Sequence, residues 1–262
     1  MMTRLQCLGL VLCGAFSALG CGPYSTRPEV MPDCSAGNGY DLSRVFLDSS
    51  TLAVGAMAHG FAFGDLTPGA TLDAGQVIDV DPTVTCGHLH VFDMESSGHD
   101  DYGSSIFLQL NGFNGSGAQG IFFWARAPVV DSSKVVTLLL ADKHVDAEGG
   151  GCTAAPSTPM NTDTTTVASQ TGTNANQTYN MVPAATDCDN FFQTIVEFTN
   201  EWTLYLLPYQ LFAQQQLPNR TPDGLDTSAL YDFGLQIPKE SHFEIWIDQI
   251  GVYQPMSAAA GP

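Results

Sequence analysis

The sequence predicts an all-β protein folded as a two-sheet antiparallel β-sandwich. About ten short runs alternate apolar with polar residues or are rich in β-branched and aromatic residues, and turn residues separate them. The sequence has no convincing amphipathic helix. Its 262 residues suit one large β domain with a substantial core, or two small domains. Short strands with turns between them are typical of antiparallel sandwiches.

The clearest strand is HFEIWIDQIGVY, residues 242–253, in which apolar residues alternate with polar residues and a tryptophan. One face holds Phe243, Ile245 and Ile247, and the other holds Glu244, Trp246 and Asp248. A period of two residues is that of a strand. We expect the first face to enter the core.

A second strand with the same pattern is GIFFWAR, residues 120–126. One face holds Ile121, Phe123 and Ala125, and the other holds Phe122, Trp124 and Arg126. In both strands the second face carries a tryptophan beside an ionisable group. Such a pair suits a sugar-binding sheet face, but it is also common in ordinary sandwich cores.

Further candidate strands lie on both sides of GIFFWAR. In chain order they are 44–48, 52–63, 77–81, 88–93 and 104–110, then 135–141, 194–198, 202–207, 208–212 and 230–237. The run 52–63 is rich in Ala and Gly, which predicts a strand with a bulge or, less readily, a short helix. The run 135–141, VVTLLLA, is mostly apolar and indicates a strand buried on both faces.

Residues 1–20 have the pattern of a secretory signal peptide. A single cation, Arg4, precedes the apolar run 8–19, and small residues precede Cys21. The segment ALGC resembles a bacterial lipobox, which predicts cleavage before Cys21 and lipidation of that residue. Cleavage by the ordinary signal peptidase is the alternative, because Ala18 stands where a lipobox usually has leucine.

We therefore expect an exported protein of the cell envelope, either an outer-membrane lipoprotein or a protein of the cell surface. It would contact the membrane through its lipid anchor only. Residues 21–39 are polar and contain several prolines, which predicts a tether. Residues 40–255 are expected to form a single β-sandwich domain, followed by a tail at 256–262.

The segment 152–188 differs in composition from the rest of the chain. It is rich in Thr, Asn, Ala and Pro, and it contains no Lys or Arg. A segment with so few large apolar residues cannot bury a core. We expect a long loop inserted in the domain.

Four cysteines remain when the signal peptide and Cys21 are set aside. They are Cys34, Cys86, Cys152 and Cys188. An even number in an exported chain predicts disulfides, and four cysteines allow three pairings. We prefer Cys34–Cys86 and Cys152–Cys188. A zinc site is the weaker alternative, since the chain has no C-x-x-C pair.

The charge of the chain excludes some partners. Lys and Arg together number 8 against 27 Asp and Glu, a formal net charge of −19. So few cations cannot form the basic surface that nucleic acid or an anionic lipid surface requires. The negative charge favours solubility, and it would attract cations such as calcium.

An ordered series of motifs in the second half of the chain resembles a known family. The series is GIFFWAR, a Cys…Cys-Asp pair, EWTLYLLPYQLF, FGLQI and FEIWIDQIGVY. It is similar to the jelly-roll carbohydrate-binding modules with a galactose-binding-domain-like fold, and it shares features with the complex I intermediate-associated protein family. The resemblance covers roughly residues 120–253. It implies a jelly-roll sandwich and a polysaccharide or other glycan as partner.

The resemblance also implies a structural calcium ion, because several members of the family hold one near the end of a sheet. Asp248 is the one carboxylate that the motif assigns to it. Gln249 stands where the family often has a second aspartate. Calcium takes six to eight oxygen ligands, and the sequence identifies no others.

The candidate sugar-binding residues are Trp124, Arg126, Trp246 and Tyr205, expected on a concave sheet face. Aromatic rings would stack on sugar faces, and charged groups would bind hydroxyls. The alternative is that the tryptophans are packing residues of the sandwich. His88 and His90 share a strand face, where a metal site is conceivable, but such pairs more often lie on a solvated surface.

The sequence contains none of the common hydrolase, zinc-protease or phosphate-binding motifs. We therefore predict a non-catalytic carbohydrate-binding protein. One alternative is an adhesion or envelope structural lipoprotein that has lost sugar binding. A glycoside-acting enzyme is the third hypothesis. Glycoside hydrolysis needs two carboxyl groups at a defined separation, and among 27 acidic residues some pair will lie close together.

Overall fold

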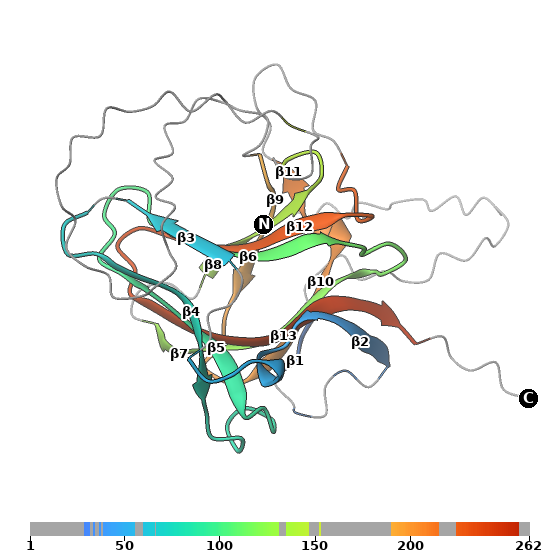
Figure 1. The fold of residues 1–262 in the computed structure, drawn as a ribbon, viewed down its shortest axis with the longest axis horizontal. Coiled ribbons are helices and arrows are strands. Elements are labelled where there is room, and N and C mark those ends of the chain that lie inside the picture. The colour runs from blue at the N-terminus through green and yellow to red at the C-terminus, as the bar shows by residue number, and fades with distance from the viewer. Residues whose placement is uncertain are drawn as a thin grey trace, which may run out of the picture.

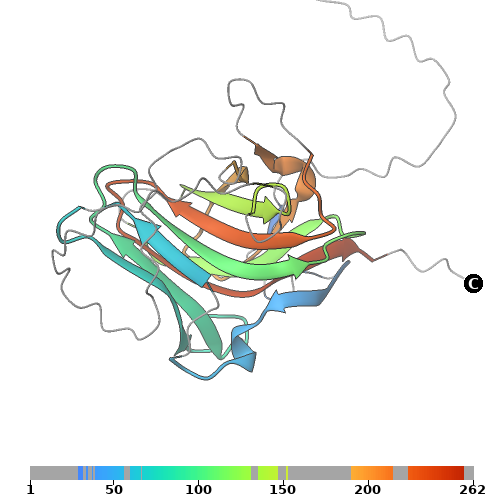
Figure 2. The same ribbon diagram turned by 45° about the horizontal axis from the view of Figure 1, so that its top comes forward.

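Two antiparallel sheets pack face to face in the computed structural model, which confirms the predicted β-sandwich (Figures 1 and 2). The structure describes residues 29–31, 34, 37, 39–55, 60–65, 67–130, 135–146, 152, 190–214 and 224–256. The predicted signal peptide, Cys21, most of the insertion 152–188 and nearly all of the C-terminal tail lie outside these residues.

Seven strands form the first sheet, sheet A. In spatial order six of them are β1 (Glu29–Met31), β10 (Thr203–Pro208), β7 (Gly120–Val130), β13 (Phe243–Pro255), β5 (His90–Ser97) and β4 (Thr71–Asp79). The seventh, β2 (Tyr40–Leu47), pairs with the second half of β13. The long β13, red in Figure 1, thus joins three neighbours.

Six strands form the second sheet, sheet B. In spatial order they are β11 (Ala213–Gln214), β9 (Phe192–Glu197), β8 (Val135–Asp142), β12 (Leu230–Ile237), β6 (Ser104–Phe113) and β3 (Gly60–Gly64). Two 3-10 turns, η1 (Ser49–Thr51) and η3 (Tyr209–Leu211), complete the described elements. Neither these turns nor any other helix in the described ranges has the length and hydrophobicity needed to cross a membrane.

The chain passes repeatedly between the sheets, as in a jelly roll. Strands β5 and β7 belong to sheet A, whereas β6 and β8 belong to sheet B. The same alternation recurs from β10 to β12 to β13. Strands that are distant in sequence, such as β5 and β13, therefore become neighbours.

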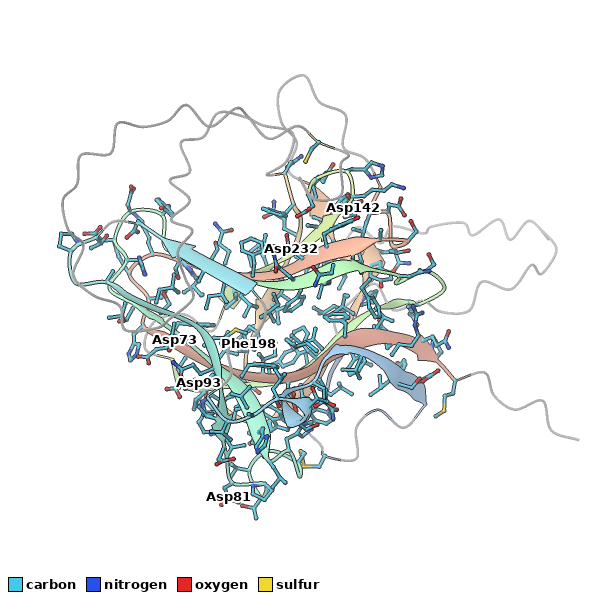
Figure 3. All side chains as sticks on the ribbon, in the orientation of Figure 1. Asp73, Asp81, Asp93, Asp142, Phe198 and Asp232 are labelled. Carbon is cyan, nitrogen blue, oxygen red and sulfur yellow. A yellow bond between two sulfur atoms is a disulfide. The ribbon has the colours of Figure 1, made fainter. Side chains whose placement is uncertain are left out.

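The core between the sheets uses the faces that the sequence predicts. Phe243, Ile245 and Ile247 of β13 and Ile121, Phe123 and Ala125 of β7 are fully buried there. Side chains fill the space between the two sheets, with Phe198 near its middle (Figure 3). Strand β8 is buried on both faces from Leu138 to Asp142, as its apolar run indicates, whereas Val135 is exposed and Thr137 partly exposed.

A second apolar cluster covers part of the outer face of sheet A, the face turned away from sheet B. We call it the outer cluster. Its buried members are Val91, Phe122, Trp124, Trp202, Leu204, Leu206 and Tyr253. Residues of β2 and Cys86 pack against it. Both faces of β7 and β10 are therefore apolar.

The N-terminal part of the sandwich begins earlier than the sequence indicates. Residues Glu29–Met31 lie within the expected tether, yet they pair with β10 as strand β1. Cys34 forms the predicted disulfide with Cys86. Cys152 is also disulfide-bonded, and Cys188, its predicted partner, lies outside the described residues.

Two expected strands are shorter or absent. Of the described residues within 52–63, Gly60–Phe63 are strand, and residues 52–55 form a turn after η1, whose N-cap is the Asp48 side chain. In 208–212 the chain forms η3. Pro208 lacks the N–H that a continuing ladder needs, which explains the change of direction.

Candidate functional site

One row of side chains crosses four strands on the outer face of sheet A. Strand register places Trp246 of β13 opposite Asp93 of β5 on one side and opposite Arg126 of β7 on the other. Asp93 in turn lies opposite Gln76 of β4. Residues directly opposite in antiparallel strands have Cβ atoms about 5 Å apart. These four side chains therefore form a continuous row, the Trp246 row.

The contact between Arg126 and Trp246 lies at one end of the row. The guanidinium carbon of Arg126 is 5.1 Å from the centroid of the indole ring, a cation–π geometry. Nε1 of Trp246 donates a hydrogen bond to Oε1 of Glu244 at 3.0 Å. Both Arg126 and Trp246 are partly exposed. The pair thus places a partly exposed aromatic ring and a guanidinium against each other at the surface.

Arg126 is one of the few cations of this acidic chain. No ion pair of Arg126 occurs among the described residues, although acidic residues outnumber basic ones by 27 to 8. Its Nε atom is buried without a hydrogen-bond partner in the same part of the chain. Among the described residues the guanidinium thus has no carboxylate partner, and its Nε has no acceptor.

Carboxylates surround the indole on its other side. Glu244 lies opposite Glu95, which lies opposite Asp73, in a line next to the Trp246 row. Burial raises the pKa of Asp93 to about 6, and repulsion from Glu244, Asp73 and Glu95 adds to it. Figure 3 labels Asp73 and Asp93 on the adjacent strands β4 and β5. Hydrogen-bond acceptors therefore outnumber donors on this surface.

Trp124 does not lie on this exposed surface, which corrects the prediction that it stacks on sugar. It is 6% exposed within the outer cluster. Its ring lies parallel to that of Trp202, with 6.5 Å between centroids and 7° between planes. His88 packs against both rings. The alternative interpretation, a packing tryptophan, describes Trp124.

Tyr205 also lies away from the site, again contrary to the prediction. On β10 the residues on either side of it, Leu204 and Leu206, point to the outer cluster. Tyr205 therefore points into the core, where it is fully buried and stacks on Phe123. Its hydroxyl accepts a hydrogen bond from the backbone N–H of Thr199 at 3.0 Å. A ring in this position cannot contact a sugar.

Asp248 does not fit the structural calcium ion that the resemblance implies. Its carboxylate accepts from the backbone N–H of Ser49 at 2.8 Å and lies 2.7 Å from Nδ1 of His88. The residue is 1% exposed. Within the described ranges no three His, Cys, Asp or Glu side chains gather in a way that would hold a metal ion. Both carboxylate oxygens of Asp248 thus already have a partner, one a backbone amide and the other a histidine.

His88 and His90, the two histidines discussed from sequence, have separate carboxylate partners, and His99 has a third. His88 pairs with Asp248, His90 lies 3.1 Å from Asp79, and His99 lies 2.9 Å from Asp65. Each of these pairs ties two segments of the fold together.

Asp93, Glu95, Asp73 and Gln76 are site residues that sequence reasoning did not identify. Alternation in 88–93 indicates that Asp93 is on the face opposite Phe92. Its neighbour across the sheet, however, depends on the pairing of β5 with β13, and no local pattern reports that pairing.

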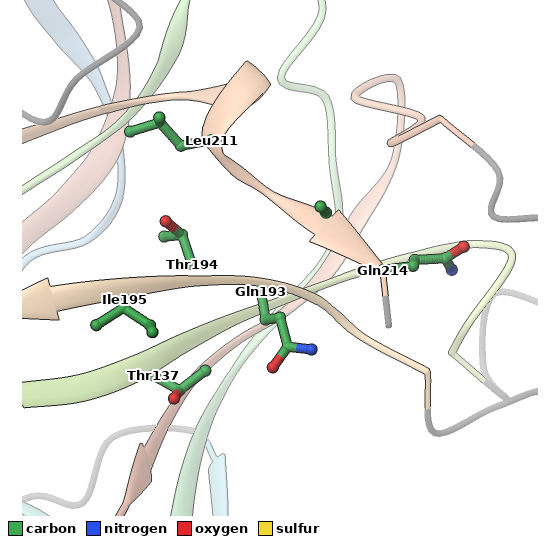
Figure 4. A pocket seen from close by; sticks show the side chains of 7 residues that line it. Thr137, Gln193, Thr194, Ile195, Leu211 and Gln214 are labelled. Atoms are coloured by element: carbon green, nitrogen blue, oxygen red, sulfur yellow. The ribbon is translucent and has the colours of Figure 1, made fainter. Parts of the chain in front are cut away.

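A hollow lies at the edge of sheet B, between β9, β11 and η3 (Figure 4). Its volume is about 500 Å³. The lining side chains are Thr137, Gln193, Thr194, Ile195, Leu211, Ala213 and Gln214. They include no aromatic ring and no charge, so this hollow is less suited to sugar stacking than the Trp246 row.

The sequence matches no family model and no curated protein. Among solved structures, a family 11 carbohydrate-binding module of a Clostridium thermocellum cellulase shares 12% identity over 81% of this chain and 95% of the module, with a TM-score of 0.49. A family 30 module from the same organism shares 15% identity over 82% and 97%, with a TM-score of 0.43. A family 11 module bound to a mixed-linked β-1,3-1,4 tetrasaccharide shares 10% identity over 75% and 96%, with a TM-score of 0.42. At these identities the likeness concerns the fold alone.

Proposed function

We propose that this protein is an exported, lipid-anchored and non-catalytic carbohydrate-binding protein whose site is the Trp246 row. The observation that carries the proposal is a partly exposed indole with Arg126 on it and carboxylates around it. Sugars have C–H faces that pack on an aromatic ring and hydroxyls that bond to charged groups.

The shape of the row favours an extended ligand. It crosses four neighbouring strands, which is about 14 Å at the usual strand spacing. The ligand would lie across the strands, with Arg126 at one end and Gln76 at the other. An oligosaccharide has a suitable length and a suitable mixture of apolar faces and hydroxyls.

Calorimetry and polysaccharide pull-down test this function with soluble gluco-, xylo-, manno- and galacto-oligosaccharides and with insoluble glycans. Trp246→Ala should weaken binding about tenfold, since an aromatic contact of about 1.4 kcal/mol is lost. Ile195→Ala, at the exposed edge of sheet B, is the matched control and should bind normally. Parallel titrations with calcium and with a chelator test whether the ion affects binding.

Binding that survives Trp246→Ala would place the site elsewhere. A folded sample that binds no glycan would favour the adhesion or envelope role instead.

The anchor is tested separately from the sugar site. Cells expressing the protein are labelled with a fatty acid, and the protein is followed into membrane fractions. Label and membrane association should both disappear in Cys21→Ser. A Cys21→Ser protein that stays with the membrane would contradict the anchor.

One observation favours a catalytic alternative. Asp93 has its pKa raised to about 6 and lies near the carboxylates Glu244 and Glu95, and glycoside hydrolysis uses a protonated and an ionised carboxyl together. Release of reducing ends from a glycan, lost in Asp93→Asn, would establish an enzyme. We expect no release, because these groups lie on a sheet face instead of flanking a cleft.

A further inference from the structure

A hollow of about 320 Å³ opens beside Arg126, at the end of the Trp246 row. The Cys34–Cys86 disulfide, Glu201, Trp202 and Arg126 contribute to its lining. Arg126 therefore borders both the hollow and the exposed indole of Trp246. A ligand lying on Trp246 needs to pass only this one side chain to enter the hollow.

Two buried N–H groups of the lining residues have no acceptor. Trp202 is 3% exposed, and its Nε1 has no hydrogen-bond partner within the described part of the chain. Nε of Arg126 is in the same situation. Most buried N–H groups in proteins are paired. An oxygen atom supplied by a ligand would give these donors the acceptor they lack.

The charges of the hollow balance each other. Arg126 contributes one positive charge and Glu201 one negative charge, and Glu201 is exposed. No hydrogen bond or ion pair of the Glu201 carboxylate occurs among the described residues. A carboxylate accepts hydroxyl hydrogens, whereas the N–H groups donate to hydroxyl oxygens. Donors and acceptors with no net charge suit an uncharged polyol.

The surroundings disfavour an anionic ligand. Asp93, Glu244 and Glu95 lie near the other end of the Arg126–Trp246 contact, where burial and then repulsion from the neighbouring carboxylates raise the pKa of Asp93. A uronic acid or a sulfated sugar on Trp246 would add to this repulsion.

We infer that the hollow is a second sugar subsite, which takes an uncharged unit of the same glycan chain that lies on Trp246. Hydroxyl oxygens of this unit accept from Nε1 of Trp202 and Nε of Arg126, and one hydroxyl donates to Glu201. The inference rests on the proposed function and adds the subsite and the uncharged class of ligand. A ligand long enough to occupy both places binds more tightly than a single sugar.

NMR spectroscopy of the three indole N–H groups tests the subsite directly, because the protein has only three tryptophans. The ¹⁵N-labelled protein is titrated with the monosaccharide and with two- to six-unit forms of the neutral series that binds. The Trp246 signal should move with every ligand. The Trp202 signal should move only with the longer ones, in the direction of a stronger hydrogen bond.

Two variants separate the subsites. Trp202→Phe removes the donor and keeps an aromatic ring in the outer cluster, and Glu201→Ala changes an exposed loop side chain. Each should reduce oligosaccharide affinity about tenfold and leave monosaccharide binding unchanged. Glu197→Ala, an exposed glutamate on β9 of sheet B, is the matched control.

The outcomes distinguish this inference from the proposed function. Oligosaccharides that bind no better than the monosaccharide, with Trp246→Ala still reducing binding, would overturn the subsite and leave the proposed function standing. Normal oligosaccharide binding in both Trp202→Phe and Glu201→Ala would do the same. If the protein prefers an oligouronate to every neutral series, the inference that the ligand is uncharged is overturned. If the protein binds no sugar at all, both the second subsite and the proposed function are contradicted.

Discussion

Nδ1 of His88 lies 2.7 Å from Oδ2 of Asp248, and only 10% and 2% of these two side chains are exposed. The other oxygen of Asp248 accepts from the backbone N–H of Ser49. The loop before β5, the start of η1 and the middle of β13 therefore meet at one carboxylate. Because the His88 ring also packs on two tryptophans, this pair supports the outer cluster next to the Trp246 row.

Replacing Asp248 with Asn should destabilise the fold. Asp248 is the carboxylate acceptor for the Ser49 N–H and the partner of His88 in a buried place, and leaving a buried polar group without its partner typically costs about 1–3 kcal/mol. Urea unfolding, followed by tryptophan fluorescence, measures the change. Asp79→Asn is the control, because Asp79 also pairs with a histidine, His90, but is 75% exposed. It should change stability by less than about 1 kcal/mol. Equal effects of the two substitutions would contradict the conclusion that the His88–Asp248 pair supports the outer cluster.

Asp65 should stabilise the loop that precedes β6. Burial raises its pKa, but hydrogen bonds from Thr67, Asp101, His99 and Gly103 outweigh burial and hold the pKa well below its usual value. Asp65→Asn should lower the free energy of unfolding by about 3 kcal/mol, because a neutral amide replaces a charged acceptor. Asp100→Asn, an exposed residue that accepts from the same Thr67 hydroxyl, should have a small effect.

The pH dependence of this effect has a definite sign. A carboxyl whose pKa is lower in the folded state adds stability above its unfolded pKa, and this stability is lost as the pH falls. The difference in the free energy of unfolding between wild type and Asp65→Asn should therefore have its largest value at neutral pH. It should decline below about pH 4, near the ordinary value for aspartate. A difference that is constant down to pH 2 would argue against the ionised carboxylate.

Asp93 should behave in the opposite way. Its pKa is raised from 3.8 to about 6, mainly by burial and then by neighbouring carboxylates. The folded state therefore binds the proton more tightly than the unfolded state, and stability falls as the pH rises through this window. Asp93→Asn should be more stable than wild type at pH 7 by about 1–2 kcal/mol, with some of the shift screened by solvent.

Thermal unfolding at several pH values checks this prediction. The advantage of Asp93→Asn should shrink as the pH approaches 4, where Asp93 of the wild type is protonated in the folded state. A variant less stable than wild type at pH 7 would show that the ionised carboxylate is required by the fold.

The Cys34–Cys86 disulfide should contribute substantially to stability. The two cysteines are 52 residues apart, and the chain-entropy model gives about 4 kcal/mol for a loop of this length. The double variant Cys34→Ser/Cys86→Ser should lose about 2–4 kcal/mol in urea unfolding. Its tryptophan emission should shift to the red, since Trp202 lies next to the disulfide. Unchanged stability would mean that packing alone holds this segment.

Local patterns were sufficient for much of the fold. Alternation along β13 and β7 identified the core faces correctly, because side-chain direction in a strand follows residue parity. The same parity was correct for Trp246 and Arg126. It could not separate Trp124 from Trp246, since both lie on the outer face of sheet A. Trp124 is covered because segments distant in sequence, among them His88 and Trp202, pack on it, whereas Trp246 stays partly exposed.

The surroundings of Trp246 depend on contacts between distant parts of the chain. Asp93 and Trp246 are neighbours because β5 and β13 pair, and a shift of one residue would turn one of them to the other face. Jelly-roll crossings bring such strands together, and the register is set by the packing of the whole sandwich. The acidic line along Glu244, Glu95 and Asp73 was therefore not readable from sequence.

The position of β1 has a mechanical consequence. A pull on the N-terminal side of the domain reaches first the three-residue pairing of β1 with β10, and next the covalent bond between Cys34 and Cys86. Once β1 detaches, tension passes through the sulfur atoms directly into the turn before β5. The disulfide therefore prevents the segment between the two cysteines from being stretched. This segment spans a sequence separation of 52 residues, about 180 Å of extended chain. Under a reducing agent, that length would be released and β2 would be pulled from β13.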